Sequence, residues 1–170
     1  WIPPSPNLRT AEAALAYPGT CLLEATNVTE GRGTEAPFLL IGAPWLDPDA
    51  LRRRVRVAGF ALAPVQFTPV EGPAAPDPKY RRQRCLGLRV AVTDPGRARP
   101  YALGVALLHA LREQPGFGWS AVRAHHLDWL VGTRSLRQAL ERGDSVKAIL
   151  RAEAAAIKAF RAERRPALLY

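Results

Sequence analysis

The feature that most constrains the fold of this chain is a change in hydrophobic periodicity about halfway along it. Apolar runs with the length and composition of strands are confined to the first half. They cover residues 21–25, 38–41, 60–70 and 86–93. Beyond residue 100 the apolar residues recur at helical spacing instead. Because strands and helices are segregated, we predict an α+β fold: a small mixed β-sheet covered by helices, with a helix-rich carboxy-terminal half.

Helix-start and helix-stop residues bound the predicted helices. A short helix over residues 11–16 is expected to end at the Pro18-Gly19 turn. Asp47-Pro48 is typical of a helix start, and helical spacing then continues to Gly59. Later helices are predicted at 102–114, 126–131 and 135–141, with a last one after the cap at 143–145. The apolar stripe of this last helix is rich in alanine, so we expect it to face the core rather than a membrane surface.

The length of 170 residues allows one substantial core. No apolar run approaches the roughly 18 residues that a membrane-spanning helix needs. The first nine residues hold three prolines and show no apolar periodicity, so residues 1–9 are expected to be an extended lead-in to a domain over 10–170. The chain begins with Trp1 rather than Met, which indicates a fragment whose upstream part is missing.

The charge balance of the chain is strongly basic. The 24 Lys and Arg against 15 Asp and Glu give a formal charge of +9, which is compatible with an anionic partner. The two best basic clusters for nucleic-acid binding, Arg52–Arg56 and Lys79–Arg84, are short, and aromatic interleaving is limited to Tyr80. The excess of Arg, Ala and Pro is typical of a GC-rich coding sequence. We therefore expect these clusters to be solvated faces and predict no nucleic-acid partner.

Cysteine and histidine give no sign of a metal centre. Cys21 and Cys85 permit one disulfide or none. His125 and His126 are adjacent and would point in different directions, and His109 lies in an apolar helical stretch. The chain also lacks a G-x-S-x-G nucleophile motif and a glycine-rich phosphate loop. No metal and no cofactor are predicted.

The densest polar constellation lies between residues 24 and 34, directly after a predicted buried strand. It combines two carboxylates, an amide, three hydroxyls and a guanidinium. Gly31 and Gly33 flank Arg32 and allow backbone conformations that other residues resist. A planar Arg fork held in this way suits a bidentate grip on a carboxylate. The alternative is a solvated turn with a local ion pair between Glu30 and Arg32.

This loop and its surroundings resemble a known family, the bacterial exo-β-N-acetylmuramidases, long catalogued only as a conserved domain of unknown function. The matching stretches are Pro4–Leu8, Tyr17–Cys21, Glu24–Thr34, Ile41–Trp45 and Leu168–Tyr170. Together they run nearly end to end in the order and spacing of the family. Ala25 and Thr29 depart from the family pattern, which favours Gly and Ser there, and both changes leave the polar groups of the loop in place.

The resemblance implies a two-domain protein with its active site in the cleft between the domains. Residues 1–9 would be the linker from a missing amino-terminal Rossmann-like domain, and residues 10–170 the smaller carboxy-terminal α+β domain. The implied activity is the release of N-acetylmuramic acid from the non-reducing end of peptidoglycan-derived glycans, without a cofactor. The implied location is bacterial, with the cell envelope or the exterior favoured over the cytoplasm.

The chemistry of glycoside hydrolysis constrains what this chain can contribute, because the reaction normally needs two carboxyl groups across the bond. By resemblance, the principal catalytic glutamate lies in the missing domain, and the Glu24–Thr34 loop forms the other wall of the cleft. Arg32 is assigned to the lactyl carboxylate, the charged group that distinguishes muramic acid from N-acetylglucosamine. The remaining assignments are Glu30 as a supporting carboxylate, with Asn27, Glu24 and Thr34 as substrate-binding residues.

The expected partners are therefore a muramyl glycan and the protein's own amino-terminal domain, without insertion into a membrane. A non-catalytic glycan-binding module is the first alternative. A basic nucleic-acid-binding domain is a distant second.

Overall fold

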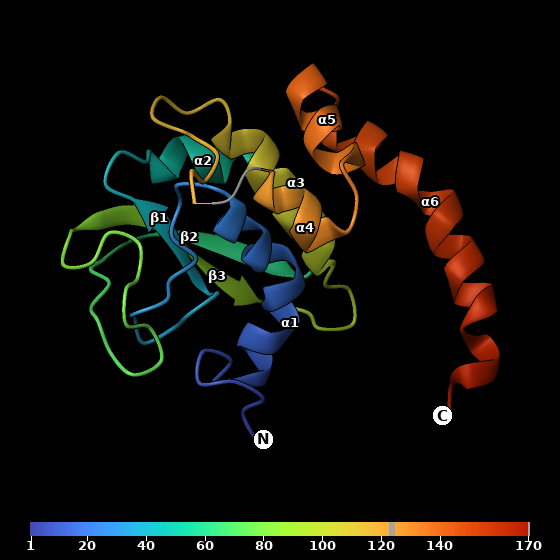
Figure 1. Cartoon of the computed structure of the whole chain (residues 1–170), viewed down its shortest axis with the longest axis horizontal. Coiled ribbons are helices and arrows are strands. Elements are labelled where there is room, and N and C mark those ends of the chain that lie inside the picture. The colour runs from blue at the N-terminus through green and yellow to red at the C-terminus, as the bar shows by residue number, and fades with distance from the viewer. Residues whose placement is uncertain (123–124, 170) are drawn as a thin grey trace.

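The computed structural model of the chain describes residues 1–122 and 125–169 (Figure 1). Its centre is a three-stranded sheet in the order β1-β3-β2. The strands are β1 (Leu40–Ala43), β2 (Phe60–Phe67) and β3 (Cys85–Val92). Both strand pairs are antiparallel, so the α+β class is confirmed while the sheet is antiparallel rather than mixed.

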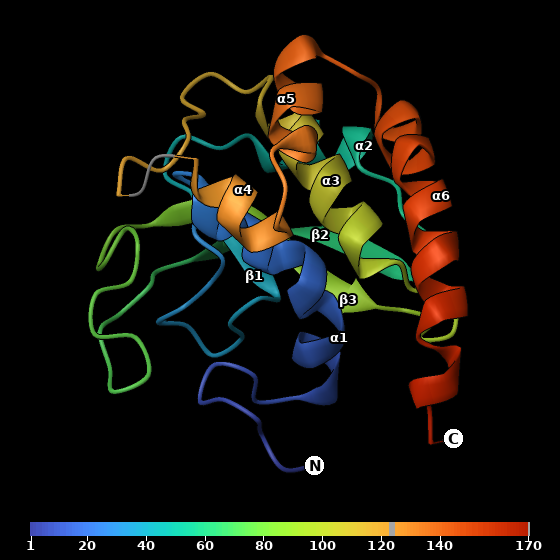
Figure 2. The ribbon, with the colours of Figure 1, turned by 45° about the vertical axis from the view of Figure 1, so that its right-hand side comes forward.

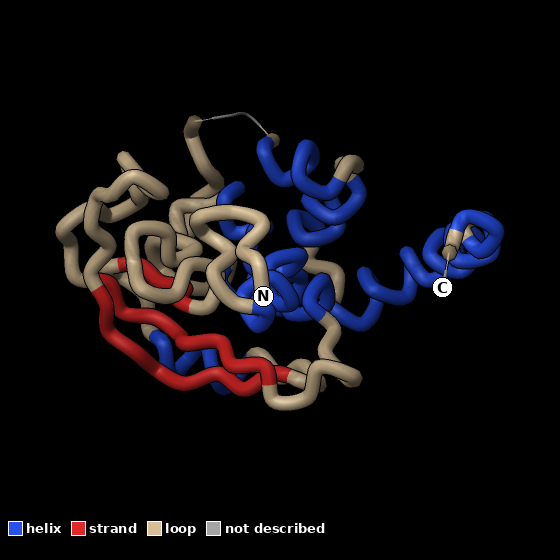
Figure 3. Tube along the Cα trace, turned by 90° about the horizontal axis from the view of Figure 1, so that it is seen from below, coloured by secondary structure: helices blue, strands red, loops and turns tan. Residues whose placement is uncertain are grey.

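Two helices, α1 (Ala11–Thr20) and α3 (Pro100–Leu111), pack against each other and form most of the core together with the sheet. They approach closely because glycines meet at their contact: a Cβ on Gly104 would lie 2.5 Å from the carbonyl oxygen of Gly19. Figure 3 shows the sheet at one edge of the molecule, with most helices to one side of it. On β2 the alternate residues Ala61 and Ala63 are exposed, as expected for an antiparallel strand with one solvated face.

The sequence prediction of a strand over residues 21–25 is wrong, because Cys21–Ala25 forms a 3₁₀ helix, η1. Helix α1 also continues through Pro18 to Thr20 instead of ending at the Pro18-Gly19 turn. The apolar side chains of Leu22 and Leu23 are buried within the helical layer, where η1 contacts α3 and α4 (His126–Val131) rather than a neighbouring strand. A short apolar run does not by itself distinguish these two outcomes.

The other elements match their predicted positions with shifted ends. Helix α2 (Pro48–Arg54) starts at the predicted Asp47 cap, whose side chain accepts a hydrogen bond from the Ala50 amide, but it ends before Gly59 because Val55 is extended. Helices α4 and α5 (Ser135–Arg142) lie where the spacing predicts them. Residues 1–9 contain no helix or strand, although the Asn7 side chain donates to the Ala74 carbonyl and Leu8 packs against the core.

The last helix, α6 (Val146–Glu163), begins at the predicted cap but is largely uncovered. Ile149 is its one buried residue, whereas the side chains of Ile157 and Phe160 are 45% and 60% exposed. The prediction that its apolar stripe faces the core is therefore wrong beyond the first turns. Figures 1 and 2 show α6 standing beside the body, with its far end away from the sheet. A three-residue 3₁₀ helix, η2 (Arg165–Ala167), follows it. None of the described helices is long and apolar enough to cross a membrane.

Both cysteines are free. Cys21 lies at the start of η1 and Cys85 at the start of β3. Burial raises the pKa of each thiol to about 11, with the charge of Glu24 contributing at Cys21. Both thiols therefore stay protonated at neutral pH.

Candidate functional site

The polar loop predicted from the sequence links η1 to β1 and is fixed by its glycines. Gly31 and Gly33 both have φ of +80°. A Cβ on Gly31 would lie 2.3 Å from the carbonyl oxygen of Leu40, so no larger residue fits there without moving the backbone. The Gly31 amide donates to Thr29 Oγ1 at 3.2 Å, and Thr34 Oγ1 donates to the Gly31 carbonyl at 2.6 Å. These bonds hold the backbone turn that presents Arg32.

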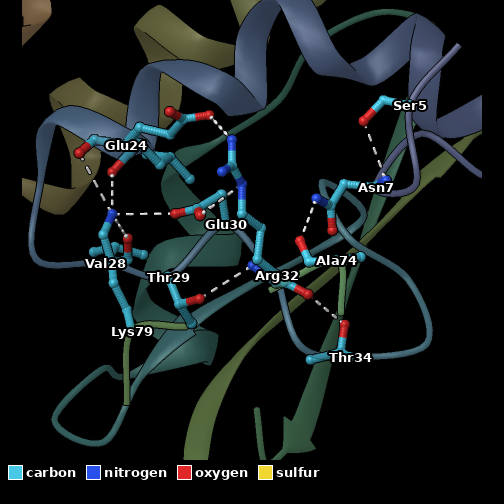
Figure 4. A network of polar contacts seen from close by, with 12 residues as sticks. Ser5, Asn7, Glu24, Val28, Thr29, Glu30, Arg32, Thr34, Ala74 and Lys79 are labelled. Carbon is cyan, nitrogen blue, oxygen red and sulfur yellow. Dashed lines mark hydrogen bonds and ion pairs between the residues drawn. The ribbon is translucent and has the colours of Figure 1, made fainter. Parts of the chain in front are cut away.

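Four charged side chains meet on this loop, as Figure 4 shows. Arg32 Nη2 donates to Glu24 Oε1 at 2.7 Å, and Arg32 Nε lies 3.4 Å from Glu30 Oε1. The other oxygen of Glu30 accepts a hydrogen bond from Lys79 Nζ at 3.1 Å. The Glu30 side chain is only 7% exposed, so its two cationic neighbours compensate a buried charge. We call Glu24, Glu30, Arg32 and Lys79 the charged cluster.

An aromatic pair supports the guanidinium of Arg32. Its Cζ lies 5.4 Å from the ring centroid of Phe38, within the range of a cation–π contact. Phe38 meets Tyr17 edge to face at 4.8 Å, and burial raises the pKa of the Tyr17 hydroxyl. Phe38 is a buried non-glycine residue at φ of +66°, a conformation that is held by its surroundings and is typical of functional sites. Its amide donates to the Glu30 carbonyl at 2.7 Å.

An open cavity of about 460 Å³ lies against the charged cluster. All four cluster side chains line it, and the opposite walls come from residues 74–78 together with Ser120, Val122 and His126. This volume lies within the range of small-molecule sites. The lining of the cavity therefore includes the half-exposed guanidinium of Arg32, the ammonium of Lys79 and the carboxylates of Glu24, Glu30 and Asp77.

The structure brings together only part of the predicted set. Glu24, Glu30 and Arg32 meet at the cavity, whereas Asn27 and Thr34 do not line it. The Asn27 side chain donates to the Gly116 carbonyl at 2.7 Å and accepts from the Gly118 amide at 2.9 Å. Thr34 lines a neighbouring cavity of about 450 Å³ that also contains Asn7.

Sequence reasoning missed Lys79 and Tyr80, which were assigned to a solvated basic face. Lys79 Nζ is instead in contact with the loop, and Tyr80 Oη donates to the Asn27 carbonyl at 2.5 Å while accepting from Trp45 Nε1 at 3.2 Å. One signal could have found Lys79: it is one of three lysines in a chain whose other basic residues are arginine. Lysine is needed where a compact ammonium, not a planar fork, must meet several acceptors.

Metal ligands do not assemble in the part of the chain that the structure describes, where no group of three His, Cys, Asp or Glu side chains could hold an ion. His109 lies on α3, and His126 lies at the edge of the cavity as the first residue of α4.

Comparisons with known proteins agree in pointing to one family. The family described as "Exo-beta-N-acetylmuramidase NamZ, C-terminal" matches residues 15–170. The chain is 29% identical to the peptidoglycan beta-N-acetylmuramidase NamZ of Bacillus subtilis (strain 168), over all of this chain and 40% of that protein.

Two solved structures of DUF1343 family proteins from Bacteroides fragilis NCTC 9343 share the fold. The first has a TM-score of 0.82 at 19% identity and covers 100% of this chain and 45% of its own. The second has a TM-score of 0.70 at 27% identity, and the match covers 99% of this chain and 44% of the second protein's chain. The chain thus spans less than half the length of each of these relatives. Because the family match extends over nearly the whole sequence, the chain belongs to the family of NamZ exo-β-N-acetylmuramidase carboxy-terminal domains.

Proposed function

We propose that this domain belongs to an enzyme that releases N-acetylmuramic acid from the non-reducing end of peptidoglycan-derived glycans, and that it forms one wall of the active-site cleft. The observation that carries the proposal is the charged cluster on an open cavity. Residues 1–9 would link it to an amino-terminal Rossmann-like domain that forms the other wall. The enzyme would act in the bacterial cell envelope or outside the cell.

Arg32 is the residue proposed to select muramic acid. Of its five N–H donors, one on Nη2 is used by Glu24, and Nε faces Glu30 without forming a hydrogen bond. Within the described residues, both donors on Nη1 and the second on Nη2 have no acceptor. Donors therefore remain on both terminal nitrogens, Nη1 and Nη2, and two of them can take a carboxylate in a bidentate manner. The lactyl carboxylate of muramic acid supplies that group, and N-acetylglucosamine does not.

Glu30 is proposed as a supporting carboxylate rather than the proton donor. Both of its oxygens already face cations, Lys79 on one side and Arg32 on the other. A general acid must instead hand a proton to the leaving oxygen of the sugar. Glu24 would orient Arg32 through their hydrogen bond. Asn27 and Thr34 would act indirectly, by holding the loop.

Hydrolysis of a chromogenic β-N-acetylmuramide tests the proposal. It is measured with this chain alone and with a longer protein that carries the amino-terminal domain, using the matching β-N-acetylglucosaminide as the control substrate. We expect activity only in the longer protein, with a strong preference for the muramide over the glucosaminide. Activity of this chain alone would place the catalytic carboxylates within it, with Glu24 and Glu30 the first pair to test. Inactivity of both proteins would favour a non-catalytic glycan-binding module.

A further inference from the structure

Lys79 lies in an exposed, proline-rich loop, yet its ammonium group is surrounded by hydrogen-bond acceptors of the protein. Its Nζ lies 2.9 Å from the Val28 carbonyl, 3.0 Å from the Leu23 carbonyl and 3.1 Å from Glu30 Oε2. A longer contact of 3.5 Å reaches the Glu24 carbonyl. These acceptors come from η1 and from the first half of the polar loop. Figure 4 shows Lys79 beside Glu24, Val28 and Glu30.

The number of acceptors matches the chemistry of an ammonium group. Lysine has three N–H donors and no acceptor, and three short contacts use all of them. Lys79 therefore has no donor left for a ligand in the cavity, although its side chain lines that cavity. Its contribution must pass through the groups that it holds, which makes it a positioning residue.

The charges of the cluster show which groups Lys79 positions. Arg32 and Lys79 balance Glu24 and Glu30, and the exposed Asp77 is the remaining carboxylate at the cavity. Without the Lys79 charge, Arg32 would be the only cation beside two carboxylates, one of them buried. An entering carboxylate would then meet a site with one positive charge fewer, in which Arg32 alone compensates both Glu24 and Glu30. With Lys79 present, Glu30 has its own cation on one oxygen, and the outer edge of Arg32 remains available.

We infer that Lys79 is a positioning residue of the muramyl site: it fixes the Glu24–Arg32 loop and neutralises Glu30, so that Arg32 can bind the substrate carboxylate. This inference rests on the proposed function of the cavity. It also makes a claim about the loop itself, which can be measured whether or not the protein hydrolyses a muramide.

The test uses Lys79→Cys in the longer protein, with and without treatment by 2-bromoethylamine, which rebuilds a lysine-like side chain on the new thiol. The two thiols of this domain, Cys21 and Cys85, whose pKa burial raises to about 11, stay protonated at pH 8 and react slowly. Lys158→Cys, on the exposed part of α6, is the matched control and receives the same treatment.

We expect Lys79→Cys to lower kcat/KM on the chromogenic muramide by on the order of 100-fold, the scale of a site displaced by about 1 Å. The loss should appear in KM for the carboxylate-bearing substrate, and aminoethylation should restore it. Lys158→Cys should behave as the wild type in both states. An unchanged KM, or a loss that aminoethylation does not reverse, would overturn the inference.

Amide hydrogen exchange separates this inference from the proposed function. In Lys79→Cys we expect faster exchange in residues 24–32, unchanged exchange in α3, and a return to slow exchange after aminoethylation. If the wild type hydrolyses no muramide, the proposed function fails, while restored protection of 24–32 still supports positioning by Lys79. Amide exchange in residues 24–32 that is equally fast in the wild type and in untreated Lys79→Cys would contradict the positioning role of Lys79.

Discussion

Gly31 shows how a single residue fixes the geometry of the candidate site. Its positive φ and its contact with the Leu40 carbonyl leave no room for a side chain. The sequence places a flexible glycine beside Arg32 but does not reveal which backbone atom lies against it. In the same way, the sequence identifies the carboxylates and the guanidinium of the loop, while the bond between Glu30 and Lys79 depends on a contact across 49 residues.

Replacing Gly31 by alanine should destabilise the domain more than the same change at Gly143. Both glycines have φ near +80°, so both substitutions cost about 1 kcal/mol in backbone conformation. Only Gly31 adds a collision with backbone, whereas nothing lies within 4 Å of a Cβ on Gly143. We expect Gly31→Ala to lower the free energy of unfolding by about 3 kcal/mol and Gly143→Ala by about 1 kcal/mol. Equal losses of unfolding free energy in the two variants, measured by urea denaturation, would show that a Cβ at position 31 does not collide with the Leu40 backbone.

At the scale of secondary-structure elements, the sequence predicts well where hydrophobic periodicity is long and poorly where it is short. Strand β3 and helices α3 and α4 lie close to their predicted ranges. The strand predicted over residues 21–25 is wrong, because a short apolar run that is buried on all sides has the same sequence pattern in a buried strand and in a 3₁₀ helix. The prediction that the apolar stripe of α6 faces the core is wrong for another reason. Periodicity identifies an apolar face but does not show whether another element covers it.

The two halves of α6 should therefore differ in their contribution to stability. Ile149 is 4% exposed and packs in the core, so Ile149→Ala should cost about 2–4 kcal/mol. Ile157 lies two turns further on the same helix at 45% exposure, and Ile157→Ala should change the free energy of unfolding by less than about 0.5 kcal/mol. Equilibrium unfolding of this chain measures both. A similar cost at the two positions would show that the far half of α6 is covered in solution.

The contact between α4 and α5 should make stability depend on pH. Arg137 Nε and Nη2 donate to the two oxygens of Asp128 at 2.9 and 2.8 Å, which holds the pKa of that carboxyl below its usual range. A lowered folded-state pKa stabilises the domain above the unfolded pKa of about 4, and this stabilisation is lost as the pH falls through the folded value. We expect wild type to be more stable than Asp128→Asn at pH 6 and this difference to shrink towards pH 2. A difference independent of pH would exclude the ionised pair as its source.

At the scale of the whole molecule, the proposed role of the domain is that of a carboxylate-binding wall, which an amino-terminal domain would complete. The charged cluster and its cavity lie on a scaffold of α1, α3 and the sheet, and the chain spans less than half of its relatives. The α+β class follows from the segregation of strands and helices in the sequence. The antiparallel pairing of the strands does not follow from the sequence, since the direction of each strand depends on where its long connection re-enters the sheet.

The substrate preference of Arg32→Ala in the longer protein tests directly whether Arg32 binds the lactyl carboxylate. The ratio of kcat/KM on a chromogenic β-N-acetylmuramide to that on the matching glucosaminide is compared with the ratios of wild type and of Arg52→Ala, an exposed arginine on α2. A charge-assisted pair contributes about 1.5–3 kcal/mol, so the ratio should fall by on the order of 10- to 100-fold in Arg32→Ala alone, with the fold retained. An unchanged ratio would show that Arg32 does not bind the lactyl carboxylate.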